Sequence, residues 1–235
     1  MSAMSPSNIL LILSVLVFAT AFVTVLLYTR NMQVLDANAL AWFAQERGLE
    51  TLNKADRAFR KAWKRVPHLA PMGAELQFTR IAYGVLPHDD GDITVFPTSA
   101  VIIFPGGGMV RHRTVFSVSI QFIESFSIVR RSGWQQLHSL RVSPTQDPDF
   151  DNARLVLSKS KDAAHACLTD EFKAIILETD DWWSPFRSWN NTTYPIWIVT
   201  GGRLILVVPQ RPHRFPLDEA FDRLLHARET LLAAV

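Results

Sequence analysis

The sequence has few of the residues that build disulfide-linked or zinc-stabilised folds. It contains one cysteine, Cys167, among 235 residues, which excludes an internal disulfide and any zinc site made of several cysteines. It also lacks an excess of charge of one sign, since 24 Lys and Arg stand against 22 Asp and Glu. Nothing in that balance points to nucleic acid. At 48% hydrophobic and 20% charged, the chain is too apolar for a disordered protein and too charged for a polytopic membrane protein.

Charge is missing altogether from the beginning of the chain, where Arg30 is the first ionisable side chain. A tail of residues 1–8 precedes residues 9–28, which are apolar except for the hydroxyls of Ser14, Thr20 and Thr24. Twenty helical residues span about 30 Å, the thickness of the bilayer core. The hydroxyls can bond back to their own helix. The sequence therefore predicts a transmembrane helix over residues 9–28.

A cleaved signal peptide is the alternative for this segment, because Ala19, Thr20 and Ala21 resemble a cleavage site. Signal peptides begin with a basic stretch, however, and residues 1–8 contain neither Lys nor Arg. The apolar run also continues to Leu27. We therefore favour a retained, single-pass membrane anchor.

The distribution of Lys and Arg predicts the orientation of this anchor. The tail has none, whereas basic residues follow the helix from Arg30 onward. Because basic flanks stay on the cytoplasmic side, we expect the N-terminus outside and the C-terminal domain in the cytoplasm.

Two juxtamembrane helices are expected within residues 36–66. Asp36 or Asn38 can cap the first, which Gly48 would end. The second gathers apolar residues, among them Phe59 and Trp63, on one side. The opposite side carries six cations, namely Lys54, Arg57, Arg60, Lys61, Lys64 and Arg65. This helix either lies on anionic lipid with both aromatic rings inserted, or packs on the domain with its cations in water. We favour the second interpretation.

Residues 70–235 should form one α+β domain, an antiparallel sheet with packed helices. Strand patterns fill residues 76–158, and residues 114–123 alternate as in a strand buried on one face. A helix is expected over residues 161–178, with a cap available at Thr169. Gly201 and Gly202 predict a hairpin turn, and Pro216 opens a terminal helix.

Several segments are candidate sites. A loop over residues 180–189 holds Trp182, Trp183, Phe186 and Trp189, which would either contact a partner or cover the protein's own core. The glycines of residues 105–108 favour a hairpin loop over a phosphate cradle. Residues 88–92 are predicted to form a polar turn and residues 147–151 an acidic loop. Cys167 is predicted to be a buried thiol. No metal or cofactor motif is expected, since the seven histidines lack paired spacing.

The order of these pieces resembles a family of uncharacterised bacterial single-pass membrane proteins. The resemblance is carried by LAWFAQERG at residues 40–48, by the strand and helix at residues 154–177, and by GGRLILVVPQR with LDEAFDRLL in residues 201–235. Residues 84–112 depart from the family pattern. The resemblance implies an anchor and an α+β domain, with no activity and no functional residue.

These observations predict a membrane-tethered, non-catalytic interaction module or an accessory subunit of a membrane complex. The expected partner is a protein in the membrane or at its cytoplasmic face. The proposed contact residues are Lys54, Arg57, Phe59, Arg60, Lys61, Trp63, Lys64, Trp182, Trp183, Phe186 and Trp189. The alternatives are a membrane-anchored hydrolase using His88, Asp90 or His112, and a domain that binds anionic lipid.

Overall fold

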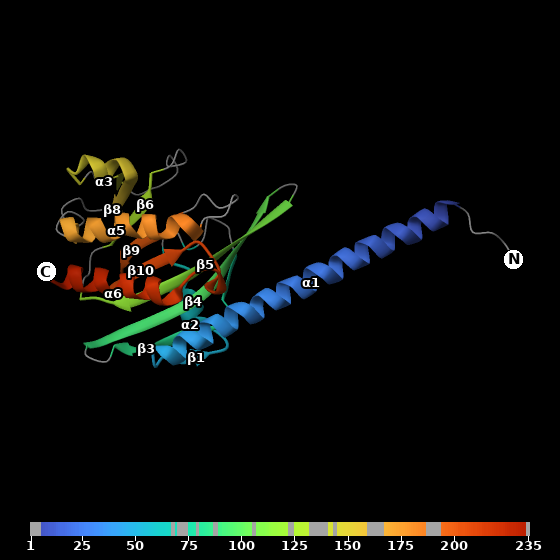
Figure 1. Cartoon of the computed structure of the whole chain (residues 1–235), viewed down its shortest axis with the longest axis horizontal. Coiled ribbons are helices and arrows are strands. Elements are labelled where there is room, and N and C mark those ends of the chain that lie inside the picture. Colours follow the sequence, from blue (N-terminus) through green and yellow to red (C-terminus); the bar gives the residue numbers. More distant parts are fainter. Residues whose placement is uncertain are drawn as a thin grey trace.

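A computed structural model of the chain describes residues 6–66, 69, 75–78, 80–86, 89–104, 107–121, 125–131, 141–142, 145–158, 167–186 and 194–233. The fold is α+β, as the sequence predicts (Figure 1). The helices are α1 (Pro6–Glu46), α2 (Arg57–Trp63), α3 (Pro148–Ala153), α5 (Asp170–Trp183) and α6 (Leu217–Ala233), with short 3-10 turns η2 (Ser184–Phe186) and η3 (Pro212–Arg214).

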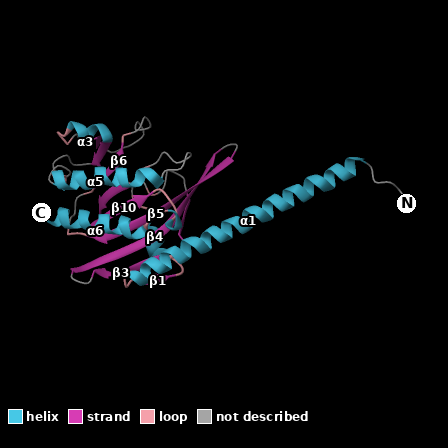
Figure 2. Cartoon of the chain, viewed as in Figure 1, coloured by secondary structure: helices cyan, strands magenta, loops and turns pink. Residues whose placement is uncertain are grey.

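The strands form one antiparallel sheet (Figure 2). They are β1 (Glu50–Leu52), β2 (Glu75–Phe78), β3 (Ile81–Leu86), β4 (Asp89–Phe104), β5 (Gly107–Ser119), β6 (Phe126–Arg130), β7 (Arg141–Val142), β8 (Arg154–Ser158), β9 (Ile196–Thr200) and β10 (Arg203–Val208). Their order is β1-β3-β4-β5-β10-β9-β6-β8-β7, and β2 pairs with β4.

Helix α1 is a single helix of 41 residues that projects far from the domain (Figure 1). Its outer part is long and apolar enough to cross a membrane, with a mean hydropathy of 2.8. Ser14, Thr20 and Thr24 bond back to carbonyls one turn earlier, as expected. The predicted helix start at Asp36 or Asn38 is wrong, because α1 continues unbroken through both residues. The predicted stop is confirmed, since Gly48 has a positive φ of 65°.

The inner end of α1 forms part of the hydrophobic core. Leu40 and Phe43 are fully buried, and the Phe43 ring lies edge-on to Phe116 of β5 and to Phe221 of α6. Trp42, the neighbour of Phe43, points away and is 58% exposed. The helix that leaves the domain is therefore anchored in it through one side.

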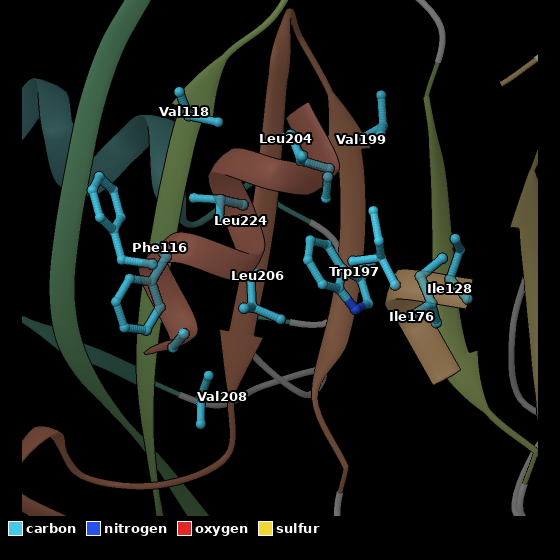
Figure 3. Packing of buried hydrophobic residues seen from close by; sticks show 14 of the residues in the cluster. Phe116, Val118, Ile128, Ile176, Trp197, Val199, Leu204, Leu206, Val208 and Leu224 are labelled. Carbon is cyan, nitrogen blue, oxygen red and sulfur yellow. The ribbon is translucent and has the colours of Figure 1, made fainter. Parts of the chain in front are cut away.

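Both faces of the sheet are covered. Helices α5 and α6 lie on one face, where Leu224 and Ile176 approach Leu206 and Trp197 (Figure 3). On the other face a second cluster joins Trp63 to Phe96 and Val115. Strand β5 is antiparallel as predicted, but the expectation of one exposed face is wrong. Between residues 114 and 118 its side chains are buried on both sides, because α2 and the segment at Leu69 cover the second face.

Strand β4 is longer than the sequence indicates, because it runs through Pro97 without a break. The partner of β4 changes at this point. Strand β3 pairs with it up to Val95, and β2 pairs with it from Thr98 onward. A proline lacks the N–H that a strand donates to its neighbour. At the change of partner that donor is not required, so the strand continues through the proline.

Local signals explain the turns and caps. Gly201 and Gly202 have φ values of 56° and 72° and close the β9–β10 hairpin, as predicted. The hairpin interpretation of residues 105–108 agrees with the antiparallel pairing of Phe104 with Gly107, whereas residues 105 and 106 lie outside the described residues. Thr169 caps α5 by accepting a bond from the Phe172 N–H. Two expected loops are instead helical, because α3 follows a cap at Asp147 and α5 extends to Trp183.

We predict that Phe43→Ala lowers the free energy of unfolding by about 3–5 kcal/mol, because it removes a buried ring from the junction of α1, β5 and α6. Thermal or denaturant unfolding of the full chain in detergent measures the loss. The matched control is Trp42→Ala, at the exposed next position, which should change the stability by less than about 1 kcal/mol. Equal losses in the two variants would contradict the anchoring of α1 through its Phe43 side.

Candidate functional site

The predicted basic helix is present as α2, and its two sides have different surroundings. Asp56 caps it by accepting a bond from the Phe59 N–H. Trp63 is only 6% exposed, and its ring centroid lies 4.7 Å from that of Phe96. Phe59 is half-buried, 5.2 Å from the same ring. The cations are exposed, namely Lys54, Arg57, Arg60, Lys61, Lys64 and Arg65.

This arrangement corrects part of the predicted contact surface. Phe59 and Trp63 pack against the sheet, so they do not supply rings for a lipid surface or a partner. The reason is that the aromatic side chains of β2 and β4, Phe78 and Phe96, form a complementary apolar surface beneath them. The alternative in which the helix packs on the domain with its cations in water fits the structure.

The predicted aromatic segment is likewise largely internal. Trp183 is fully buried, and Phe215 lies edge-on to both Trp182 and Trp183. Trp182 and Phe186 are half-buried, and the Trp182 Nε1–H donates to Glu219 of α6 at 2.6 Å. Trp189 lies outside the described residues. Trp183 is therefore a core residue, because α5 continues through it and its ring packs against Phe215.

The residues of the hydrolase alternative do not all come together. His112 lies on β5 opposite Ser99 of β4. Asp90 belongs to the same strand as Ser99, nine residues away, which corresponds to about 30 Å along a strand. His88 lies outside the described residues. His112 and Asp90 thus belong to different parts of the sheet.

The structure instead assembles a polar network where α1 enters the domain. The Asp36 carboxylate, only 8% exposed, accepts a bond at 2.7 Å from the Arg211 guanidinium and contacts His213 Nδ1 at 2.6 Å. A second nitrogen of Arg211 lies 2.7 Å from His112 Nε2, and His112 Nδ1 lies 2.8 Å from Ser99 Oγ. We call these five residues the root network.

The donor and acceptor roles in the root network follow from Arg211, which can only donate. His112 Nε2 must then accept, so its proton is on Nδ1 and points to Ser99 Oγ. A serine nucleophile needs the opposite arrangement, in which the histidine accepts the hydroxyl proton. Burial, followed by the charge of Arg211, lowers the pKa of His112 to about 4. This imidazole is a weak base, and the arrangement serves to hold α1 in place.

The same side of α1 continues from the root network to a second ion cluster. Asp36, Leu40, Phe43 and Ala44 follow the i, i+4, i+7 and i+8 spacing of one helical face and are all buried. At the end of this face Arg47 bonds to Asp218 at 2.7 Å and to Asp222 at 2.8 Å, both on α6. These contacts raise the pKa of Arg47, with the Asp222 bond the largest cause. The buried face of α1 therefore has an apolar centre, with charged contacts of Asp36 and Arg47 at its two ends.

Sequence reasoning missed the root network, although one signal was present. Asp36 precedes Leu40 and Phe43 at helical spacing, so a continuous helix would place its carboxylate on the buried side. Its partners Arg211 and His213 lie 175 and 177 residues away along the chain. No local pattern connects them.

The site has no metal-ligand geometry in the part of the chain that the structure describes, because no three His, Cys, Asp or Glu side chains are grouped to hold an ion. Comparisons with family models, curated proteins and solved structures find no match to this chain. The resemblance to bacterial single-pass membrane proteins therefore stays a prediction.

We predict that His112 makes the stability depend on pH. Its pKa is about 4 in the folded protein and 6.5 in its ordinary state, so between these values the unfolded chain binds more protons. Stability is fully present above pH 6.5 and falls as the pH drops toward 4. The loss should be about 1–2 kcal/mol, because partial exposure weakens the effect.

Denaturant unfolding of the full chain in detergent between pH 4 and 7 measures this dependence. Carboxylates titrate in the same range, so the informative quantity is the difference between variants. His112→Gln should flatten the curve, and His226→Gln, at an exposed position on α6, should leave it unchanged. A curve that keeps its full slope in His112→Gln would show that His112 is not the responsible group.

Proposed function

We propose that the protein is a membrane-tethered, non-catalytic interaction module that presents the basic side of α2 to an acidic protein partner. The observation that supports this proposal is the division of α2, which buries Trp63 and leaves its cations exposed. Within the described residues no ion pair joins Lys54, Arg57, Lys61 or Lys64 to an acidic side chain.

The attachment of α1 supports the same proposal. The membrane helix enters the core without a break and is held at both ends of its buried face, by Asp36 and by Arg47. A flexible linker would let the domain rotate freely above the membrane. With this attachment the position of α2 relative to the helix is constrained, which suits a subunit that meets a partner in or beside the same membrane.

A protein partner is favoured over anionic lipid for a physical reason. Helices that bind the membrane surface place aromatic or aliphatic side chains in the headgroup region. In α2 both rings, Phe59 and Trp63, already pack on Phe96. The exposed side of α2 then carries cations without an aromatic ring that could insert into lipid. Such a surface suits contact with an acidic protein surface.

Co-purification of the full chain from a mild detergent extract tests the proposal. We expect a defined protein partner to co-purify. Its recovery should fall at least about tenfold in the combined variant Arg57→Glu, Lys61→Glu and Lys64→Glu, because three reversed contacts together exceed 1.4 kcal/mol. The charge-preserving control is Arg57→Lys, Lys61→Arg and Lys64→Arg, which should keep the partner. A monomer without partners, or equal recovery in both variants, would contradict the proposal. Loss of co-extracted anionic lipid alone would support the lipid alternative.

We further propose that the N-terminus is outside and the domain is in the cytoplasm, on the basis of the basic residues that follow the membrane helix. A membrane-impermeant maleimide should not label Glu229→Cys, at an exposed position on α6, in intact cells, and should label it after permeabilisation. The unmodified chain is the control, because its Cys167 is only 1% exposed. Labelling in intact cells would contradict this orientation, and a mature chain that begins near residue 22 would identify a cleaved signal peptide.

A further inference from the structure

Helices α5 and α6 present an acidic outer side. They lie side by side on the sheet (Figure 2) and together contain nine Asp and Glu against three Lys and Arg. Seven of these carboxylates are exposed, whereas Lys173 and Arg228 are buried and Arg223 is half-buried. The side of the two helices that faces water therefore carries negative charge without an exposed Lys or Arg.

Three of the exposed carboxylates form a line along α5. Glu171, Glu178 and Asp181 are separated by seven and three residues, which places them on one side of a helix. None of the three forms an ion pair with another residue that the structure describes. The line extends over about 15 Å. It is a surface whose charge the described part of the domain does not balance.

The basic side of α2 has the complementary form. Arg57, Lys61 and Lys64 follow the i, i+4 and i+7 spacing of one helical face, are exposed and extend over about 10 Å. Residues 53–66 contain six basic and one acidic side chain, an excess of five positive charges. Helices α5 and α6 have an excess of six negative charges, from nine acidic and three basic side chains. The two sides can therefore neutralise each other almost completely.

The two charged sides lie across the sheet from each other. Neighbouring residues of a strand point to opposite faces, and in β5 Phe116 faces α5 and α6 whereas Val115 faces α2. Phe116 contacts Phe215, which packs against the end of α5. Val115 pairs with Phe96, whose ring contacts Trp63 of α2. One copy of the chain thus carries opposite charges on its two outer surfaces, over the same part of the sheet.

Helix α1 turns both of these surfaces sideways. The side of α1 that contacts the domain runs from Asp36 to Arg47, a length of about 16 Å, so the helix runs along the sheet and does not point into it. The two faces of the sheet are therefore directed away from α1 at roughly right angles to its axis. With α1 across a bilayer, the basic and acidic sides face neighbouring molecules in the plane of the membrane. Copies inserted in the same direction then present opposite charges to each other at about the same distance from the bilayer.

We propose that α2 of one copy binds the acidic side of α5 and α6 on a second copy, so that the chains associate head to tail in the membrane. This association names the acidic partner of the proposed function, and it rests on that function because α1 must hold each copy in the bilayer. The two contacting surfaces differ, so each pair keeps one free basic and one free acidic side, and further copies can extend it into a ring or a row. Contacts between exposed charges are weak in solution, and confinement in one membrane raises the effective concentration at which they form.

Energy transfer between labelled full chains in vesicles tests this proposal. Chains that carry a donor or an acceptor dye on a C-terminal tag are reconstituted together in phosphatidylcholine vesicles, which contain no anionic lipid. We expect transfer above the level of random proximity at low salt. It should fall to that level at about 1 M salt, where charges are screened beyond about 3 Å.

Two charge-reversed variants separate the two surfaces. The α2 variant combines Arg57→Glu, Lys61→Glu and Lys64→Glu. The α5 variant combines Glu171→Lys, Glu178→Lys and Asp181→Lys. In vesicles that contain one variant alone, the excess transfer should fall at least about tenfold, because an altered side then meets the side that it no longer attracts.

Charge-preserving variants are the matched controls and should keep the transfer. On α2 these are Arg57→Lys, Lys61→Arg and Lys64→Arg. On α5 they are Glu171→Asp, Glu178→Asp and Asp181→Glu. The thermal unfolding midpoint of each variant shows whether the domain remains folded.

Mixing the two variants gives the decisive measurement. A donor-labelled α2 variant and an acceptor-labelled α5 variant together contain one unaltered acidic side and one unaltered basic side, on different chains. Transfer in the mixture should therefore rise at least about fivefold above that of either variant alone. A partner other than the chain itself would produce no such recovery.

The remaining outcomes distinguish failure of this inference from failure of the proposed function. Transfer that neither variant lowers, or that the mixture does not restore, overturns the head-to-tail contact. No transfer in the unmodified chain, with a different protein co-purified and lost in the α2 variant, overturns the second copy and keeps the proposed function. No transfer and no co-purified protein overturns both.

Discussion

The burial of one side of α1 in the domain is the constraint on which the rest of the structure depends. Leu40, Phe43 and Ala44 complete the core between β5 and α6, and Asp36 and Arg47 add ion pairs at either end. Apolar contacts supply most of the free energy, because they are fully removed from water. The charged contacts determine the rotation of the helix, since Asp36 must meet both Arg211 and His213. Together they make the domain a continuation of α1.

This constraint connects elements that are far apart in the sequence. It brings the 209–214 segment to the base of the β4–β5 hairpin, and it sets that base level with residue 36 of α1. The extended hairpin and the apolar part of α1 then leave the domain together. On the other face of the sheet, α2 packs its aromatic rings over Phe96 and presents its cations to water. One attachment thus constrains how α2 lies relative to α1.

Local patterns were decisive wherever a few neighbouring residues determine the backbone. The Gly201-Gly202 turn, the stop at Gly48 and the cap at Thr169 follow from conformational preferences that act within four residues. Local patterns failed where the surrounding strands or the preceding helical turns decided the backbone instead. Pro97 did not end β4, because β3 and β2 change over at that position. Asp36 did not begin a helix, because the preceding apolar turns continue through it.

The sequence by itself determined the long apolar helix, the antiparallel strands and the division of α2 into a basic and an apolar side. Each of these depends on the order of polar and apolar residues over one or two turns of helix or a few strand residues. Only the tertiary structure decided that the apolar side of α2 faces the sheet, that Trp183 is internal, and that Asp36 binds Arg211. The physical reason is that burial and ion pairing depend on partners as far as 175 residues away along the chain. No periodicity records such distances, so the level of the hairpin beside α1 appears only once the chain is folded.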